Sequence, residues 1–225
     1  MNHSATIAFD HVTFHYHDGS RLFSDLCLEL ESGGFYLIKG PSGTGKSTLL
    51  RLMNRLEEPS KGQLLFQGNP FLTFPAPELR RLVLYIQQTP VVTDGSVKAN
   101  LLMPFSFKNN RHLPLPDDAR LRSLLDEFSL DKIPLDKQAR ALSVGQQQRL
   151  CLIRGLLLSP SVILLDEPTS ALDDESSRIV ENMAESLYRD QGKTIVMVSH
   201  REFRPINVTP IILNVEDGRI TILPH

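Results

Sequence analysis

The stretch that decides the fold is residues 40–47, which read GPSGTGKS. A short apolar segment, 35–39, precedes it, and a segment with apolar residues at helical spacing, 46–56, follows it. Glycines let a polyphosphate approach backbone N–H groups closely, and the positive end of the following helix attracts the anion. A strand, a glycine-rich loop ending in Gly-Lys-Ser and a helix together form the phosphate-binding P-loop pattern. The sequence therefore predicts a nucleoside triphosphate site at this loop.

Two side chains of the loop have specific predicted roles. Lys46 is expected to reach the β- and γ-phosphates, and the Ser47 hydroxyl is expected to ligate magnesium. The full set expected to contact the nucleotide here is Gly40, Pro41, Ser42, Gly43, Thr44, Gly45, Lys46, Ser47 and Thr48.

A second stretch, residues 162–167, supplies two carboxylates. It reads VILLDE, four apolar residues followed by Asp166 and Glu167. A buried strand that ends in an acid brings that acid to the edge of the sheet where the phosphate loop lies. We expect Asp166 to hold magnesium, as P-loop NTPases require. Glu167 is positioned to polarise the attacking water as a general base.

Composition limits the function classes. The chain has 225 residues, of which 41% are hydrophobic and 22% charged, and its formal net charge is -2. A near-neutral chain without a basic run has no electrostatic footprint for nucleic acid, so we expect no nucleic-acid partner. Its two cysteines, Cys27 and Cys151, have neither zinc-ligand nor disulfide-scaffold spacing and favour a reducing cytosol. No signal peptide and no membrane-spanning segment is expected.

Hydrophobic periodicity indicates an α/β fold. Alternating residues at 6–16 and 22–30 predict an antiparallel opening, and 211–215 with 219–223 predict a closing hairpin. Between them, apolar strands at 35–39, 162–165 and 194–198 alternate with helices, which points to a buried parallel sheet. Helices are expected at 117–128, 143–158 and 174–189, whereas the proline-rich stretch 70–116 gives no clear local pattern.

The segment 142–146, LSVGQ, narrows the family. It resembles the LSGGQ signature of ABC ATPases, with Val144 in place of the first of two glycines, and it lies shortly before the VILLDE strand. Ser143 is a natural helix N-cap, and a glycine at a helix start suits anion binding. With the phosphate loop and the carboxylate strand, it makes the chain similar to ABC ATPases over almost its whole length. Among these, it looks most similar to bacterial metal (iron) exporter ATPases.

The resemblance implies a P-loop NTPase core with a mostly parallel sheet, an N-terminal antiparallel β-subdomain and an inserted α-helical subdomain. Residues 1–225 are then one ATP-binding domain, with the helical subdomain at about 88–158. It also implies ATP and Mg²⁺ as bound species and ATP hydrolysis as the reaction.

The resemblance assigns further site residues. Gln87, in LYIQQ, matches a glutamine that contacts magnesium and the attacking water, although the adjacent Gln88 is an alternative. His200 matches a histidine that contacts the γ-phosphate, and Tyr16 matches an aromatic residue that stacks on adenine. Residues 170–173 match a loop along the dimer interface. The residues implied to close over the nucleotide of a second subunit are Ser143, Gly145 and Gln146.

The expected partners are therefore a second copy of the chain, joined through ATP, and a separate polytopic membrane permease. The permease would hold the chain on the inner face of the cell membrane. Two other interpretations compete with a transport ATPase: a soluble ABC ATPase acting outside transport, and a non-hydrolytic nucleotide-gated module. Soluble members usually carry coiled-coil arms, basic patches or tandem halves, which this sequence lacks, and Glu167 argues against a non-hydrolytic module.

Overall fold

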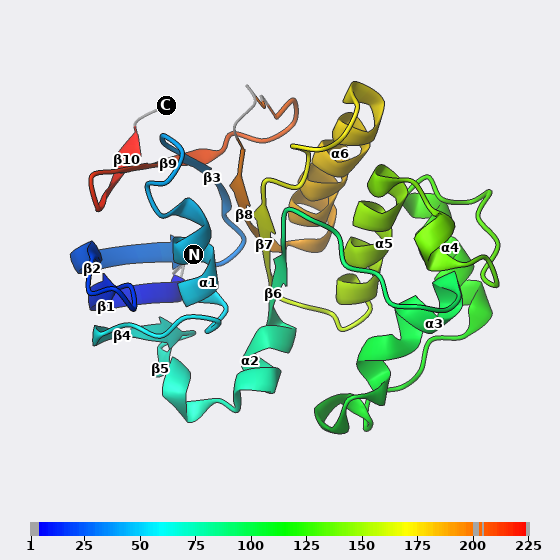
Figure 1. Cartoon of the computed structure of the whole chain (residues 1–225), viewed down its shortest axis with the longest axis horizontal. Coiled ribbons are helices and arrows are strands. Elements are labelled where there is room, and N and C mark those ends of the chain that lie inside the picture. Colours follow the sequence, from blue (N-terminus) through cyan, green and yellow to red (C-terminus); the bar gives the residue numbers. More distant parts are fainter. Residues whose placement is uncertain (1–4, 200–202, 204, 224–225) are drawn as a thin grey trace.

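A six-stranded sheet forms the middle layer of the molecule (Figure 1). The structure is a computed structural model that describes residues 5–199, 203 and 205–223. The strand order is β10-β9-β3-β8-β7-β6, and all neighbours are parallel except β9 and β10, which form a hairpin. The strands are β3 (Phe35–Lys39), β6 (Val83–Ile86), β7 (Val162–Asp166), β8 (Thr194–Val198), β9 (Ile211–Glu216) and β10 (Arg219–Leu223).

The central strands are buried on both faces, and their side chains alternate between two hydrophobic cores. In β3, Phe35 and Leu37 enter one core, whereas Tyr36 and Ile38 enter the other. β7 and β8 read as continuous apolar runs because successive strand residues point to opposite faces, and both faces of this sheet are covered.

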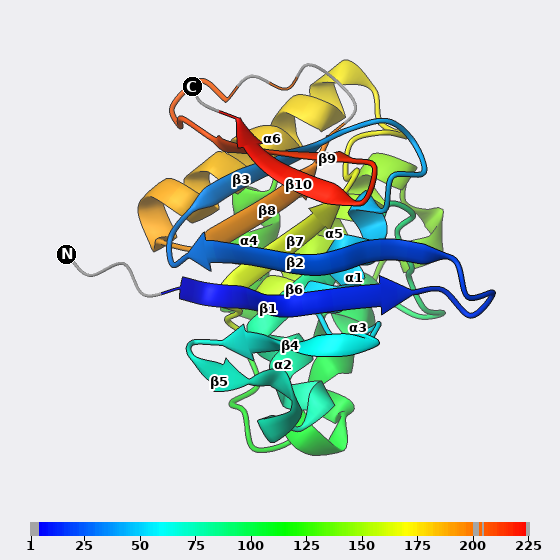
Figure 2. The ribbon, with the colours of Figure 1, turned by 90° about the vertical axis from the view of Figure 1, so that its left-hand side faces the viewer.

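The first core, here called the α1-side core, lies between the central sheet and a four-stranded antiparallel sheet. That second sheet, in the order β2-β1-β4-β5, faces the viewer in Figure 2. Its strands are β1 (Ala5–His15), β2 (Arg21–Glu31), β4 (Lys61–Phe66) and β5 (Asn69–Pro70). Helix α1 (Lys46–Met53) contributes its apolar side to this core through Leu49, Leu50, Leu52 and Met53.

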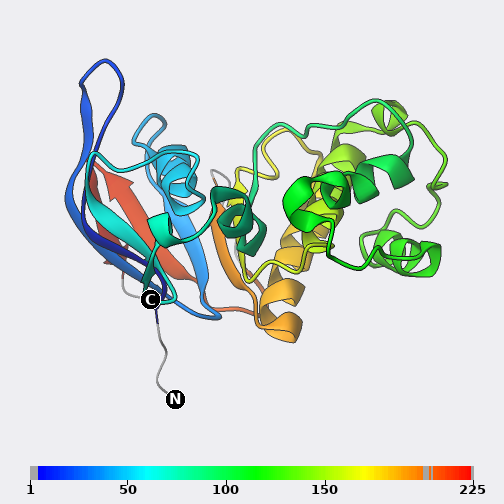
Figure 3. The ribbon, with the colours of Figure 1, turned by 90° about the horizontal axis from the view of Figure 1, so that it is seen from below.

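Helices cover the opposite face and form the helix-side core with Phe35 and Leu37. They are α3 (Val97–Leu102), α4 (Asp118–Glu127), α5 (Val144–Leu156) and α6 (Asp174–Gln191). Figure 3 shows α1 on one side of the central sheet and α5 on the other. The remaining helical pieces are α2 (Ala76–Leu82), η1 (Phe71–Thr73), η2 (Met103–Ser106), η3 (Lys108–Asn110) and η4 (Ala139–Ala141). None of the helices among the described residues combines the length and apolar character needed to cross a membrane.

The fold expected from the sequence is confirmed: a mostly parallel sheet, an antiparallel β-layer near the N-terminus and a helical part inserted in the chain. One helix is shorter than expected. The apolar spacing extended it to residue 56, but α1 ends at Met53, because Asn54 is its C-cap and Arg55 takes a left-handed φ of 56°. The stretch 70–116 forms short helices and 3₁₀ turns around β6, which are too short for periodicity to reveal.

A buried carboxylate ties the segment after β8 to α6. Glu185 is 3% exposed and accepts hydrogen bonds from the backbone N–H groups of Ile206 and Asn207, both at 3.0 Å. The Asn207 side-chain amide donates to the same carboxylate at 3.1 Å. These donors satisfy a carboxylate that would be costly to bury alone.

We predict that Glu185→Ala lowers the free energy of unfolding by about 2 kcal/mol, because it leaves part-buried N–H groups without their acceptor. Asn182→Ala, an exposed position on the same helix, is the control and should change stability by less than about 0.5 kcal/mol. Urea unfolding of both variants measures the difference. Equal stability of the two variants would show that the carboxylate contributes nothing.

Candidate nucleotide site

The phosphate loop leaves the end of β3 and turns tightly before α1. Gly40 has a φ of 142°, and a Cβ at this position would clash with the carbonyl of Val215 in β9. Gly45 is the N-cap of α1 in a left-handed conformation, with a φ of 97°. Both positions require glycine, so the glycines of the sequence pattern also form the turn that aims α1 at the loop.

The Lys46 ammonium already lies against the loop. Its Nζ donates to the carbonyl oxygens of Gly40 at 2.9 Å and Pro41 at 2.6 Å. The residue is 5% exposed. Burial lowers the pKa of Lys46, and the carboxylates of Glu167 and Asp166 act in the opposite direction. A cation held over a loop of backbone N–H groups can neutralise a bound triphosphate.

Ser47 and Asp166 meet across the boundary between α1 and β7. The Ser47 hydroxyl donates to Oδ1 of Asp166 at 3.0 Å, and Asp166 is 5% exposed. A hydroxyl and a carboxylate oxygen side by side are the hard oxygen ligands that magnesium prefers. These two residues therefore fit a magnesium ion, whose contribution when bound is to neutralise charge on the phosphates.

Tyr85 of β6 completes the hydrogen bonding of Asp166. Its hydroxyl donates to Oδ2 at 2.7 Å. The pKa of Tyr85 is raised to about 12, mainly because the residue is buried and next because its hydroxyl bonds Asp166. Sequence analysis missed this residue. The feature that could have indicated it is a side chain with a polar tip in an otherwise apolar strand. That strand pairs with the VILLD strand, and Tyr85 stands opposite Leu164.

Glu167 adopts an unusual backbone conformation, with a φ of 48° directly after β7. A non-glycine residue at positive φ is rare, and such strain gathers at functional positions. The turn that follows is fixed by Ser170, whose backbone N–H and hydroxyl both donate to the Glu167 carbonyl, at 3.2 and 3.1 Å. The half-buried carboxylate thus points from a rigid turn at the sheet edge that also carries Asp166.

Gln88, rather than Gln87, places its side chain on Glu167. Nε2 of Gln88 donates to Oε2 of Glu167 and to Oγ of Ser170, both at 3.1 Å. The Gln87 backbone carbonyl accepts from Gln148 of α5 at 3.3 Å. The side chain that contacts Glu167 is therefore that of Gln88, the alternative that the sequence left open. Side chains one residue apart in extended chain point to opposite sides, so a one-residue slip exchanges them.

Tyr16 lies beside the start of α1. Its hydroxyl shares a hydrogen bond of 3.0 Å with the Thr48 hydroxyl. Its ring packs against that of Phe14 in an edge-to-face arrangement, with the ring centroids 5.4 Å apart. The residue is 41% exposed, so part of it is accessible to a ligand. This placement next to Thr48 is compatible with an aromatic platform for a base.

The signature segment forms the N-terminus of α5 through a capping box. The Ser143 hydroxyl accepts from the Gln146 backbone N–H at 3.3 Å, and the Gln146 side chain accepts from the Ser143 N–H at 3.1 Å. Gly145 also has a packing role, because a Cβ there would lie 2.8 Å from Oγ of Ser176 in α6. Val144 is 49% exposed and adds an apolar side chain to this helix end.

The phosphate loop and the signature belong to different layers. Residues of α1 pack in the α1-side core, whereas those of α5 pack in the helix-side core (Figure 3). Side-chain hydrogen bonds between segments far apart in the chain join Ser47 with Asp166, Tyr16 with Thr48, and Gln88 with Glu167. His200 lies outside the described residues.

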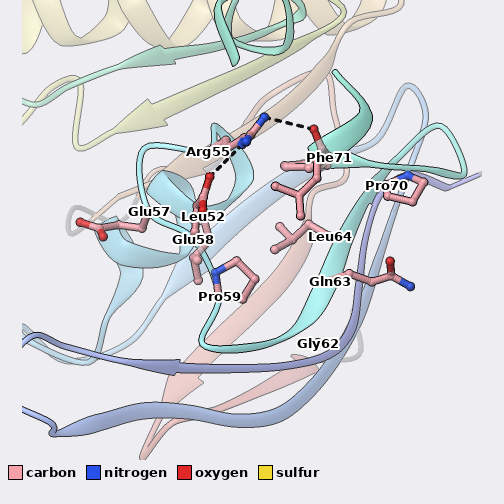
Figure 4. Close-up of a pocket in the computed structure, with 11 residues that line it drawn as sticks. Leu52, Arg55, Glu57, Glu58, Pro59, Gly62, Gln63, Leu64, Pro70 and Phe71 are labelled. Carbon is pink, nitrogen blue, oxygen red and sulfur yellow. Dashed lines mark hydrogen bonds and ion pairs between the residues drawn. The ribbon is translucent and has the colours of Figure 1, made fainter. Parts of the chain in front are cut away.

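Hollows of the surface lie near both ends of α1. One of about 670 Å³ is lined by Ser42, Gly43 and Thr44 of the phosphate loop, together with Arg21 and Arg219. Figure 4 shows a smaller cavity of about 120 Å³ beyond the other end of α1. Arg55 closes the smaller cavity by donating to Glu58 at 3.0 Å and to the Phe71 carbonyl at 3.4 Å. No predicted site residue lines the smaller cavity, whereas three residues of the phosphate loop line the larger hollow.

We predict that Gln88→Ala slows ATP hydrolysis about tenfold, because Glu167 loses a hydrogen bond to its charged group. Gln87→Ala retains the carbonyl that contacts α5 and should slow hydrolysis less. Phosphate release under saturating ATP compares the two variants. A larger loss in Gln87→Ala would restore the assignment made from the sequence.

Comparison with known proteins places the chain in a family. The profile of the ABC transporter family matches residues 23–170. The "Probable iron export ATP-binding protein FetA" of Escherichia coli (strain K12) is 36% identical over 206 residues, which cover 92% of this chain and 86% of the relative. The "Phosphonates import ATP-binding protein PhnC" of Hydrogenovibrio crunogenus is 32% identical over 226 residues, covering 97% and 83% of the two chains.

A solved structure shares the fold. It is cbiO1 from Clostridium perfringens, described as part of the ABC transporter complex cbiONQ. The TM-score is 0.82 at 24% sequence identity, and the match covers 97% of this chain and 87% of that one. The similarity to an iron exporter ATPase expected from the sequence is confirmed by the FetA match. The chain therefore belongs to the ABC transporter family, as an ATP-binding subunit with ATPase activity.

Proposed function

We propose that two copies of this chain bind ATP between them, hydrolyse it at Glu167 and thereby drive transport through a separate membrane permease. The observation that carries the proposal is the division of the site between two layers. The loop with Lys46 and the helix end at Ser143 each offer donors for phosphate, but they pack on opposite sides of the central sheet. Each is half of a site, and a second copy can supply the missing half.

Binding begins at the phosphate loop. The backbone N–H groups of residues 42–48 and the Lys46 ammonium would hold the β- and γ-phosphates. The Ser47 and Asp166 oxygens would hold magnesium with them. The partly exposed ring of Tyr16 would stack on adenine, and the hydrogen bond between its hydroxyl and Thr48 would fix the ring.

Hydrolysis follows from the position of Glu167. Its carboxylate would take a proton from water as the water oxygen attacks the γ-phosphorus and the bond to the bridging oxygen breaks. The Gln88 amide would orient the carboxylate through the 3.1 Å bond to Oε2. His200, matched to the γ-phosphate by position in the sequence, would contact the same group. The strained turn at Glu167 keeps its carboxylate beside the phosphate loop without reorganisation.

The second copy would complete the site with the N-terminus of α5. The capping box uses the Ser143 hydroxyl and the Gln146 N–H, which leaves the earlier N–H groups of the first turn for the γ-phosphate. Two incomplete halves satisfy each other in a two-fold arrangement, which is isologous and closes after two copies. ATP then belongs to the interface, so binding favours closure and hydrolysis favours release.

The permease partner rests on the relatives. FetA is named as an iron export protein and PhnC as a phosphonate import protein, both ATP-binding. The likeness to FetA favours a metal exporter as the transport class. A location on the inner face of the membrane would follow from contact with the permease. The soluble ABC ATPase considered from the sequence has no observation in its favour.

We predict that Glu167→Gln binds ATP with nearly wild-type affinity but hydrolyses it about 10² to 10⁴ times more slowly, because the general base is lost. Calorimetry measures the binding and phosphate release measures the turnover. Turnover close to that of the wild type would exclude Glu167 as the base.

We also predict that the Glu167→Gln chain dimerises with ATP and magnesium but not with ADP. Ser143→Arg should abolish this dimer, because the bulky cation fills the helix end that meets the γ-phosphate. Light scattering with ATP gives the mass, and Arg122→Ala on the exposed side of α4 is the control. A dimer that forms without nucleotide, or one that ignores Ser143→Arg, would contradict the sandwich arrangement.

A further inference from the structure

The carboxylate of Asp166 is held from two sides. Ser47 of α1 donates to Oδ1 at 3.0 Å, and Tyr85 of β6 donates to Oδ2 at 2.7 Å. Asp166 is 5% exposed, so both of its oxygens are engaged in a place where water has little access. The orientation of a buried carboxylate is set by such partners.

The sheet puts the tyrosine hydroxyl in this position. β6 is the edge strand, and it pairs in parallel with β7 so that Tyr85 stands opposite Leu164, two residues before Asp166. Val83 and Tyr85 face the α1-side core, whereas Ile86 enters the helix-side core. The Tyr85 ring therefore lies on the same side of the sheet as α1, the helix that carries Arg51.

Arg51 lies one helical turn after Ser47 on α1. Its positive charge acts on Tyr85 and lowers the pKa of that hydroxyl, against the larger effects of burial and of Asp166. Tyr85, Asp166 and Ser47 thus form a hydrogen-bonded series from the edge strand β6 to α1. The Tyr85 hydroxyl fixes Asp166, one of the two proposed magnesium ligands, through the oxygen that Ser47 does not use.

We propose that Tyr85 is a positioning residue for magnesium, which holds Asp166 so that Oδ1 faces Ser47 and the metal. The proposal rests on the magnesium assignment made above for Ser47 and Asp166. Partners that orient the ligands of a metal control its affinity, although they do not touch it. A tyrosine hydroxyl suits this role because it is neutral and donates to the oxygen that the metal does not use.

Packing alone would not need the hydroxyl. The Tyr85 ring sits against apolar residues of the α1-side core, and a phenylalanine would fill the same volume. The two roles therefore separate in Tyr85→Phe, which keeps the ring and removes only the donor. Tyr36→Phe is a matched control, because it removes a buried hydroxyl bonded to the Glu31 N–H at 2.6 Å, away from the site.

The test measures binding of a non-hydrolysable ATP analogue by calorimetry, first in EDTA and then at increasing magnesium concentration. For Tyr85→Phe we expect unchanged affinity in EDTA and a magnesium half-saturation about tenfold higher than in the wild type. Tyr36→Phe should match the wild type in both. Thermal unfolding in EDTA establishes that each variant is folded.

Three results would overturn the proposal. An unchanged or lower half-saturation in Tyr85→Phe would show that the hydroxyl does not support the metal or competes with it. An equal fall of affinity with and without magnesium, or loss of the fold, would show a structural role only. If magnesium leaves the affinity of the wild type unchanged, the magnesium assignment fails and Tyr85 loses its proposed role with it. In the first two cases that assignment stands.

Discussion

Burial of the central sheet on both faces is the constraint on which the rest of the molecule depends. β3, β7 and β8 have no exposed side on which to carry polar groups, so their chemistry appears only where they end. The ends of parallel strands lie at one edge, and a ligand binds there. Lys46, Asp166 and Glu167 come together because each lies at or just after the carboxyl end of such a strand. The apolar interior and the charged site are therefore consequences of one arrangement.

The same sheet separates the molecule into two cores, and this separation keeps the phosphate loop and the signature segment on different sides of it. α1 and the antiparallel sheet belong to one core, and α3 to α6 belong to the other. The phosphate loop opens into α1, whereas the signature opens into α5. A chain folded in this way keeps the two phosphate-binding helix ends apart. Our proposal that ATP binding needs a second copy therefore rests on this layered packing as well as on the two sequence motifs.

Sequence predicted the parts of the site that local patterns encode. The phosphate loop, the VILLD strand and the Ser143 cap all depend on residues next to each other in the chain, and the structure forms each of them. What it could not predict depends on register and on contacts across the fold. One residue of register decides whether Gln87 or Gln88 faces Glu167, and in the structure it is Gln88. The contact of Tyr85 with Asp166 depends on the pairing of β6 with β7, which no local pattern encodes.

Other residues combine roles that a motif does not separate. Gly145 fits an anion site by position, yet its contact with Ser176 also requires a residue without a side chain. The stretch 70–116 was unreadable because prolines divide it into pieces shorter than a helical repeat, and tertiary packing alone arranges them. The burial of Glu185 likewise depends on a contact across the fold, with the backbone N–H groups of Ile206 and Asn207, which no local pattern encodes.

The central claim is that the loop at residues 40–47 holds the triphosphate through the Lys46 ammonium. Calorimetry with ATP and magnesium on Lys46→Ala tests it most directly, with Lys39→Ala, an exposed lysine at the end of β3, as the control. We expect Lys46→Ala to weaken binding about 100-fold, since a buried charge-assisted contact is lost, and Lys39→Ala to bind like the wild type. Wild-type affinity in Lys46→Ala would show that the ammonium does not hold the triphosphate.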